Sequence, residues 1–315
     1  MNLHENKEDF ESLISIVANR KHIPEAAVEK DYYIVMLLNK LSHSEYVEQC
    51  VFKGGTSLSK CYPGSIERFS EDIDLTFLGA ISNDDMSNKQ CEKHLKRIEK
   101  LMADGFQIEI IPKERNDRNK SSYIIFDTKP GNRIKLEIGS SIRPDPYSKK
   151  IVKSYIHEYL EQSNMNDAIS EFELEPVELN VLNIERTFLD KVMSVKRHAI
   201  CHNLNNKVRH IYDVTRLYKM NEIQEFLKDK NELKRLLDET KNTDSFYLEK
   251  RNISEEYDPT GSYDFDSWKN YFDSDIKKIY QNLHEELLYT DEQQDFCEAI
   301  ATFEKINNLF FEIGE

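Results

Sequence analysis

The chain has 315 residues, a formal net charge of −15, 39% hydrophobic residues and 32% charged residues. This composition is typical of a soluble globular protein, and the length allows one large or two medium domains. The longest apolar run, Tyr32 to Leu38, is too short to cross a bilayer, and the first residues lack a basic then apolar signal pattern. We therefore expect a cytoplasmic protein.

The cysteine and histidine patterns argue against a disulfide framework and a zinc ribbon. The five cysteines are odd in number, widely scattered and without a C-x-x-C pair. His198 and His202 stand one helical turn apart, a spacing that can bind a transition metal. No acidic or cysteine partners accompany them, so we expect solvated or packed histidines on a helix.

The negative charge is concentrated near the C-terminus. Residues 221–315 contain 24 acidic and 11 basic residues. Residues 185–219, by contrast, contain eight Lys or Arg, three acids and three histidines. A nucleic acid or polyphosphate would be drawn to this basic stretch, although an ordinary basic helical face explains the charge equally well.

The first elements alternate between helix and strand. Residues 25–41 have the apolar spacing of a helix. Val51-Phe52 is typical of a short strand, Gly54-Gly55 of a turn, and Thr56 of a helix start capped by its hydroxyl. A turn at Pro63-Gly64 then leads to a strand over residues 73–77.

The next segment continues this mixture. A helix is expected over residues 89–102, followed by three strands at 107–111, 122–126 and 133–138. Helices and strands are therefore mixed in the first half of the chain. This predicts an α+β (mixed α/β) fold.

The second half is predicted to be mostly helical. An extended piece at residues 177–182 ends at Asn183, which can cap the next helix. The polar stretch 240–266 is expected to be a long loop. We place the domain boundary after residue 182, giving domains 1–182 and 183–315, with helices in the second domain at 185–198, 207–220, 222–237, 267–288 and 292–311.

Two aspartates at the start of the strand expected over residues 73–77 are the first candidate site residues. Residues two apart on a strand point to the same face, so Asp72 and Asp74 would lie together. Two buried carboxylates repel each other unless they are paired, protonated or bound to a cation. Mg²⁺ held by one or two carboxylates and substrate phosphates would remove this cost. A polar strand face with two solvated aspartates is the alternative.

Two further features fit the same chemistry. Glu137 shares a strand face with Lys135, and this strand can pair beside the aspartate strand. Three convergent carboxylates would bind two Mg²⁺ ions, which activate an attacking oxygen and stabilise a leaving pyrophosphate. Gly54 and Gly55 would bring backbone amides close to the phosphates of a nucleotide. A Walker A loop is excluded by the spacing.

Several segments together resemble a known family. "KGGTSL" (residues 53–58) followed by "RFSEDIDL" (68–75) is similar to the first signature of the polymerase-β-like nucleotidyltransferases, and most closely to the AbiEii/AbiGii toxin group. Four further segments also resemble segments of that group and occur in the same order. They are "EKDYY" (29–33), "KLEIG" (135–139), "ERTFLDKV" (185–192) and "RHIYDVTRLY" (209–218). The last ninety or so residues match no such segment.

The resemblance implies roles for individual residues. Gly54, Gly55 and Thr56 or Ser57 would bind the nucleotide phosphates. Asp72 and Asp74, with Glu137, would bind Mg²⁺. Lys191 resembles the phosphate-contacting lysine of the third motif, and Asp213 the acid of the fourth, which would act as general base or take part in metal binding. The alternatives are an exposed helix lysine for Lys191 and a surface partner of Arg209 or Arg216 for Asp213.

The function implied is Mg²⁺-dependent transfer of a nucleoside monophosphate from NTP to an acceptor, with tRNA as the acceptor and GTP or CTP favoured over ATP. The chain would be the toxin of a toxin–antitoxin, phage-defence system, opposed by a cognate antitoxin that acts without stable contact. The helical C-terminal domain would complete the active-site cleft. Transfer to a protein or a small molecule, and a non-catalytic NTP-binding regulator, are the alternatives.

Overall fold

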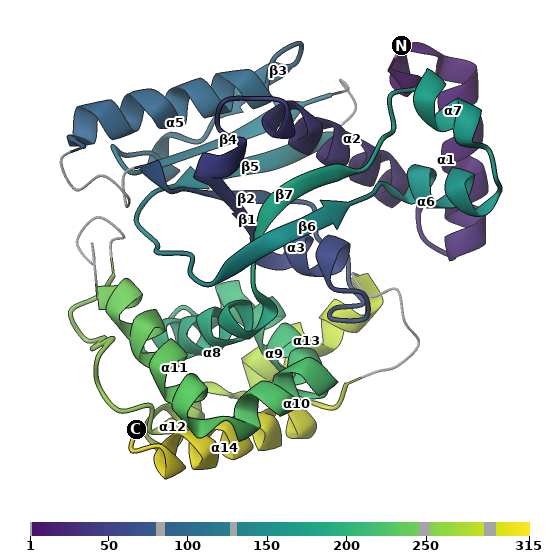
Figure 1. Cartoon of the computed structure of the whole chain (residues 1–315). Coiled ribbons are helices and arrows are strands. Elements are labelled where there is room, and N and C mark those ends of the chain that lie inside the picture. Colours follow the sequence, from purple (N-terminus) through teal and green to yellow (C-terminus); the bar gives the residue numbers. More distant parts are fainter. Residues whose placement is uncertain (1, 80–85, 127–130, 246–252, 287–293) are drawn as a thin grey trace. The chain divides into compact units, whose positions relative to one another are not determined.

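The computed structural model describes residues 2–79, 86–126, 131–245, 253–286 and 294–315 (Figure 1). The chain divides into two compact units. Unit 1 contains residues 1–61, 69–143 and 147–181, and unit 2 contains residues 62–68, 144–146 and 182–315. Two short segments from the first 182 residues therefore belong to unit 2.

Unit 1 is built on a seven-stranded sheet with the order β3-β4-β5-β2-β1-β7-β6. The sheet is mixed, because β2 runs antiparallel to β1 and parallel to β5, while β1 runs parallel to β7. The strands are β1 (Cys50–Lys53), β2 (Ile73–Phe77), β3 (Gln107–Ile110), β4 (Asn119–Ile125), β5 (Arg133–Gly139), β6 (Tyr147–Val152) and β7 (Val177–Leu182).

Helices pack against both faces of this sheet (Figure 1). Helices α2 and α5 contact β5, while α3 contacts β1, β2 and β6. The helices of unit 1 are α1 (Lys7–Lys21), α2 (Glu25–Ser42), α3 (Gly54–Cys61), α5 (Asn88–Met102), α6 (Tyr155–Gln162) and α7 (Asn166–Glu171), with short 3-10 turns at Leu3–Glu5, Val47–Gln49 and Pro112–Glu114.

The alternation of residues along β5 separates the two faces of the sheet. Ile134, Leu136 and Ile138 are fully buried, whereas the residues between them are partly exposed. On the neighbouring strand β2, Phe77 stacks on His94 of α5, with ring centroids 5.4 Å apart. The apolar face therefore lies under α5, and the polar residues of β5 and β2 lie on the other face.

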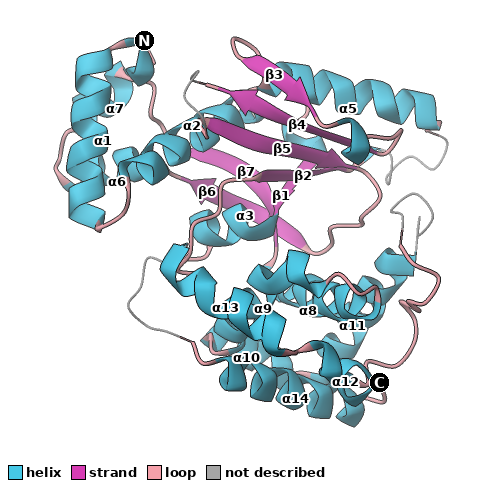
Figure 2. Ribbon diagram, turned by 180° about the vertical axis from the view of Figure 1, so that it is seen from behind, coloured by secondary structure: helices cyan, strands magenta, loops and turns pink. Residues whose placement is uncertain are grey.

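Unit 2 is helical in its described part (Figure 2). Helices α8 and α9 pack together, α10 and α11 contact α8, and α13 and α14 contact α9. The elements are α8 (Ile184–Ile200), a 3-10 turn (Leu204–Lys207), α9 (Val208–Tyr218), α10 (Asn221–Lys228), α11 (Lys230–Ser245), α12 (Phe265–Trp268), a 3-10 turn (Lys269–Tyr271), α13 (Ser274–Glu286) and α14 (Phe296–Glu312). Buried aromatic residues, among them Tyr263, Trp268 and Phe303, join α12 to α14.

The mixed α/β fold predicted from the sequence is confirmed, with local differences. Helix α3 begins at Gly54, two residues earlier than expected, so the Thr56 cap is wrong, although the chain does turn at Gly54, whose φ is +87°. The helix expected at 222–237 is interrupted at Asp229, and the one expected at 267–288 consists of separate pieces. The predicted loop at 240–266 overlaps the end of α11. Residues 246–252, 287–288 and 292–293 of the predicted elements lie outside the described residues.

The structure shows the state of the cysteines and the positions of His198 and His202. All five cysteines are free thiols. His202 lies beyond the end of α8 with a φ of 54°, so it does not share a helix face with His198. His198 is partly buried, and its Nδ1 bonds the backbone oxygen of Ser194 at 2.7 Å. Within the described ranges, no helix is long and apolar enough to span a membrane.

Candidate active site

Gly54 and Asp74 lie in direct contact at the start of α3. The chain turns from β1 into this helix with a φ of +87° at Gly54, in the left-handed region that favours glycine. A Cβ added there would lie 2.2 Å from Oδ2 of Asp74 and 3.1 Å from its Cγ. Gly54 is therefore required both by its backbone conformation and by the carboxylate beside it.

A row of polar residues crosses the sheet at the same level. Asp74 on β2 is in register with Lys53 on β1 and with Glu137 on β5. Ser121 on β4 is in register with Glu137. Residues in register on adjacent strands point to the same face, so two carboxylates and one lysine lie side by side on the face opposite α5. Lys53 was not among the predicted site residues, although it begins the glycine motif.

Asp72 stands one residue before β2 and is half-buried, so only Asp74 of the predicted pair lies within the strand. Glu137 is engaged by Lys135, whose Nζ lies 3.4 Å from its carboxylate and 2.7 Å from Glu114. Among the described side chains, no group of three or more His, Cys, Asp or Glu is placed to hold a metal. The structure therefore does not gather Asp72, Asp74 and Glu137 into the three-carboxylate centre expected from the sequence.

The residues present still fit a Mg²⁺ ion held in a simpler way. Mg²⁺ in nucleotide sites uses one or two carboxylates together with substrate phosphates and water. Asp74 offers hard oxygen ligands, and its Oδ2 lies against the Gly54 backbone, in the space that a side chain at Gly54 would need. The metal site stays a prediction that rests on Asp72 and Asp74.

The two hydroxyl groups of the glycine motif both donate hydrogen bonds to other groups of unit 1. Thr56 Oγ1 donates to Ser70 Oγ at 3.1 Å, and Ser57 Oγ donates to the Gly54 carbonyl at 3.0 Å. Both residues are buried. The first amides of a helix, by contrast, have no partner within the helix. A nucleotide phosphate would therefore meet the amides of α3 rather than these hydroxyls.

A buried ion pair fixes the other end of α3. Lys60 Nζ donates to Asp31 Oδ1 at 2.5 Å, and the Tyr155 amide donates to Asp31 Oδ2 at 2.6 Å. Lys60 also lies 4.1 Å above the Tyr155 ring. Burial raises the pKa of Asp31, opposed by Lys60. Asp31 of the "EKDYY" segment thus ties α2 to α3 and α6.

Unit 2 holds a second cluster, in which Asp213 is fully buried between two cations. Arg68 donates to it from Nε at 2.6 Å and from Nη2 at 2.7 Å, and Lys191 Nζ donates at 2.8 Å. Lys191 lies on α8, Asp213 on α9, and Arg68 in the 62–68 segment. Lys191 and Asp213 are therefore not surface residues, and the arginine, which was not predicted, joins them.

The charges of this cluster decide what Asp213 can do. Burial raises the pKa of its carboxyl, but Arg68 and then Lys191 outweigh this effect and lower the pKa to about 2. Both carboxylate oxygens already accept hydrogen bonds. A carboxylate of this kind is a weak base. Asp213 fits the role of holding Lys191 and Arg68 better than the predicted role of general base.

The basic stretch at 185–219 is largely internal. Arg186, Lys191 and Lys196 are buried, with exposed fractions of 1%, 5% and 3%. Arg197 pairs with Asp244, and Arg216 with Glu67. Five of the eight basic side chains are thus used inside unit 2. The stretch does not form the polyanion-binding surface that its charge suggested.

The predicted site residues thus fall into two groups. Gly54, which Gly55 follows in α3, lies against Asp74 in unit 1. Lys191 and Asp213 come together in unit 2, with Arg68, which precedes Asp72 by only four residues in the sequence. The expected cleft completed by the C-terminal domain stays a prediction.

The comparisons with known proteins identify the family of the chain. The family model of the nucleotidyl transferase AbiEii toxin, type IV toxin–antitoxin system, matches residues 36–303. No curated protein matches the chain. Among solved structures, the chain is similar to MenT4, a nucleotidyltransferase toxin from Mycobacterium tuberculosis H37Rv, with 16% identity and a TM-score of 0.46 over 96% of this chain and 99% of that one.

The family match covers most of the chain and includes both residue clusters, from Gly54 and Asp74 to Lys191 and Asp213. The resemblance inferred from the short motifs is thereby confirmed. The chain belongs to the AbiEii family of nucleotidyltransferase toxins of type IV toxin–antitoxin systems, and its enzyme class is that of an NTP-dependent nucleotidyltransferase.

Proposed function

We propose that this enzyme transfers a nucleoside monophosphate from an NTP to tRNA in a Mg²⁺-dependent reaction. The observation that carries the proposal is the contact between Gly54 and the Asp74 carboxylate. It puts the start of a helix, where phosphates bind, beside an oxygen ligand suited to Mg²⁺. A nucleotide triphosphate bridged to Mg²⁺ needs these two features next to each other.

Asp72 and Asp74 are the proposed metal ligands. When bound, Mg²⁺ would neutralise phosphate charge and activate the attacking oxygen. The amides of Gly54 and Gly55 would bind phosphate oxygens, while Lys53, in register with Asp74, would add a positive charge at the same edge of the carboxylate row. Glu137 would be an outer member of that row, since Lys135 engages it.

Lys191 is proposed to contact a phosphate while it stays bonded to Asp213. A lysine ammonium has three donors, and the structure uses one of them on Asp213. Arg68 holds the same carboxylate through two further bonds, which fixes the position of Asp213. Arg68 and Asp213 are thus positioning residues, and Lys191 is the residue proposed to touch the substrate.

In the proposed reaction, a hydroxyl oxygen of the RNA attacks the α-phosphorus of the NTP. A P–O bond to the acceptor forms, the P–O bond to the β-phosphate breaks, and pyrophosphate leaves with that electron pair. The hydroxyl proton is released to solvent. GTP or CTP is the proposed donor. We propose a cytoplasmic role in phage defence, opposed by an antitoxin that does not bind the toxin stably.

The test is to incubate the full-length protein with each α-labelled NTP, Mg²⁺ and unfractionated tRNA. We expect label on tRNA from GTP or CTP, release of one pyrophosphate for each nucleotide transferred, and loss of both products when EDTA removes Mg²⁺. Label that appears only on protein, or on a small molecule added in place of RNA, would replace tRNA with the alternative acceptors. Full activity in EDTA would remove the metal from the proposal.

A further inference from the structure

The solvent face of α5 carries five basic residues and no acidic residue among them. Lys89, Lys93, Lys96, Arg97 and Lys100 are all exposed. At 3.6 residues per turn, they fall within a sector of about 100° around the helix axis. We call these five residues the α5 basic stripe. Its length, from Lys89 to Lys100, is about 16 Å along the helix.

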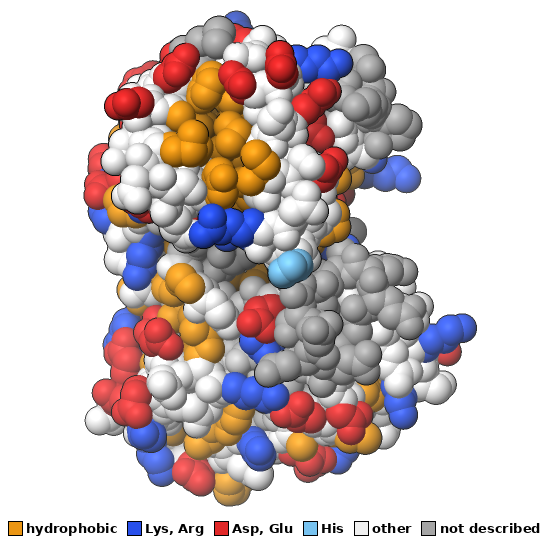
Figure 3. All heavy atoms as spheres, turned by 90° about the vertical axis from the view of Figure 1, so that its right-hand side faces the viewer, with side chains coloured by type: hydrophobic (Ala, Val, Ile, Leu, Met, Phe, Trp, Pro, Cys, Tyr) orange, Lys and Arg blue, Asp and Glu red, His pale blue; other side chains and the backbone are white. Residues whose placement is uncertain are grey.

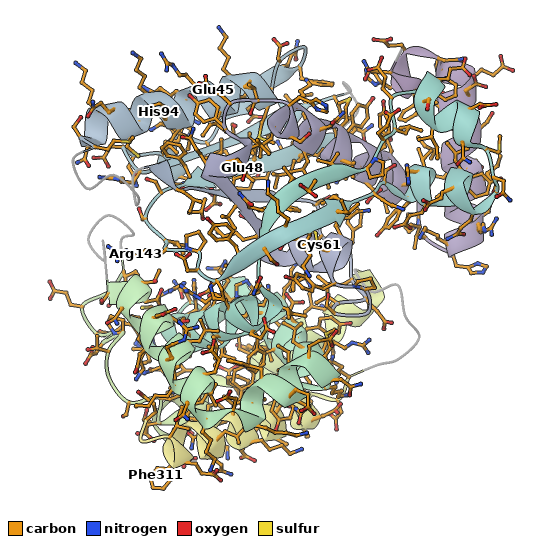
Figure 4. All side chains as sticks on the ribbon, in the orientation of Figure 1. Glu45, Glu48, Cys61, His94, Arg143 and Phe311 are labelled. Carbon is orange, nitrogen blue, oxygen red and sulfur yellow. The ribbon has the colours of Figure 1, made fainter. Side chains whose placement is uncertain are left out.

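The other side of α5 is committed to the core. Cys91, Leu95, Ile98 and Met102 are fully buried, and the helix contacts β4 and β5 with this side. His94, which is labelled on α5 in Figure 4, stacks on Phe77 of β2 with ring centroids 5.4 Å apart. Because this side of α5 is packed against the sheet, the α5 basic stripe is held on the side that faces solvent.

The stripe is unusual because its charges are not balanced. Only Lys96 forms an ion pair in the described part of the chain, with Glu92 at 2.9 Å. Helix α11 shows the ordinary pattern, since Arg235 pairs with Glu232 at 2.6 Å and with Glu239 at 2.5 Å. On the face of the protein shown in Figure 3, Lys and Arg are interspersed with Asp and Glu.

Like charges at i, i+3 and i, i+4 destabilise a helix by about 0.2 to 0.5 kcal/mol for each pair. The stripe contains several such pairs, for example Lys89 with Lys93 and Lys93 with Arg97. An exposed helix face that serves only solubility carries both positively and negatively charged side chains. Five cations on one face of a chain with net charge −15 therefore indicate a surface kept for a polyanion.

We propose that the α5 basic stripe binds the phosphate backbone of the acceptor RNA. This inference rests on the proposed function, in which the acceptor is RNA. The stripe takes the place of the 185–219 stretch, whose basic side chains are mostly internal. Lysine-rich faces bind phosphates through charge, without base specificity.

Because of the position of α5, an RNA acceptor must be long enough to reach both the α5 basic stripe and the carboxylate row. The helix covers the sheet face opposite Asp74 and Glu137. A helix is about 10 to 12 Å across, so a phosphate on its outer surface is separated from the carboxylate row by the helix and the sheet. A short oligonucleotide that carries the acceptor hydroxyl cannot occupy both places, whereas a whole tRNA is long enough to do so. The stripe is thus a docking surface rather than part of the catalytic site.

The test compares Lys93→Glu/Arg97→Glu with Lys277→Glu/Lys278→Glu, a control on the exposed surface of α13 with the same charge change. Binding of labelled tRNA to full-length protein is measured without NTP over a salt series. We expect the α5 variant to bind about tenfold more weakly, with a salt slope reduced by about 2, and the control to bind as wild type. Transfer to a short oligonucleotide that carries the acceptor hydroxyl should be equal in all three proteins.

Other outcomes have distinct meanings. Equal tRNA binding by the α5 variant and wild type would overturn the proposal, as would a wild-type protein that does not bind tRNA. If poly-glutamate displaced the labelled tRNA as effectively as unlabelled tRNA does at equal charge, the ligand of the stripe would be an acidic protein and not RNA. Loss of transfer to the oligonucleotide in the α5 variant would overturn the docking role. Salt-dependent binding through the stripe with no transfer to RNA would instead refute the proposed function alone.

Discussion

Gly54 and Asp74 are positioned so closely that no side chain fits at Gly54 unless the Asp74 carboxylate moves. The space of a Cβ at Gly54 is already filled by Oδ2 of Asp74, at 2.2 Å. The glycine therefore does more than permit a sharp entry into α3. It lets the first amides of a helix approach a carboxylate, which is the arrangement a metal-bound triphosphate requires.

Gly54→Ala should reduce transfer strongly, because the methyl group must displace the Asp74 carboxylate as well as adopt a φ of +87°. Gly64→Ala is the matched control: its φ is +77°, but nothing lies within 4 Å of the added Cβ. Both variants should lose about 1 kcal/mol of unfolding free energy from backbone strain. Steady-state transfer rates and urea unfolding separate the two effects. An equal loss of activity in both variants would mean that backbone strain alone explains the effect of Gly54→Ala.

Asp74→Asn should abolish transfer while the fold is retained. The amide keeps the shape of the side chain but binds Mg²⁺ poorly, and it removes one negative charge from the row that includes Glu137. The measurement is transfer rate against Mg²⁺ concentration, with circular dichroism as the check on folding. Glu109→Gln on the exposed edge strand β3 is the control. Wild-type rates in Asp74→Asn would remove the residue from the metal site.

Lys191→Met should lower the transfer efficiency by about 1 to 3 kcal/mol, the range for loss of a charge-assisted contact. Asp213 would keep both bonds from Arg68, so the protein should still fold. Steady-state kinetics with varied NTP give the comparison, and thermal unfolding verifies the fold. An unchanged kcat/KM would leave Lys191 with a purely structural role in its pair with Asp213.

The sequence predicted those features that depend on local periodicity. Strand β2 was placed at residues 73–77, as observed, because its apolar positions alternate. The break at Asp229 was missed, since both sides of it are rich in helix formers. The start of α3 was misplaced, because a positive φ at Gly54 followed by helix is set by the close approach of Asp74, a contact distant in sequence.

The candidate site shows the same limit. Motif order predicted Lys191 and Asp213, but not that Arg68 would complete their cluster. Charge counting identified residues 185–219, yet burial of Arg186, Lys191 and Lys196 depends on tertiary packing that composition does not reveal. The boundary predicted at residue 182 also overlooked the 62–68 segment, which belongs to unit 2 through contacts such as Arg68 with Asp213.

Asp213→Asn should be strongly destabilising at neutral pH. Removing the charge would leave Arg68 and Lys191 buried with no anion between them, a change that typically costs about 3 to 5 kcal/mol. Asp266→Asn, at an exposed position, should have little effect. Urea unfolding at pH 7 gives the comparison. A loss below about 1 kcal/mol in Asp213→Asn would mean that the cluster relaxes and is not the rigid support proposed for Lys191.

The pH dependence provides an independent check on the same residue. The pKa of Asp213 is about 2 in the folded protein, below its ordinary value of 3.8, because Arg68 and Lys191 outweigh the effect of burial. A depressed folded-state pKa contributes stability that is present above pH 4 and lost as the pH falls towards 2. Wild type should therefore lose about 2 kcal/mol more than Asp213→Asn over this interval, since one pKa unit corresponds to about 1.4 kcal/mol. Unfolding free energies of the two proteins, measured from pH 5 to pH 2, give this difference directly. Parallel curves would show that Asp213 titrates at its ordinary pKa and that the two cations do not hold it ionised.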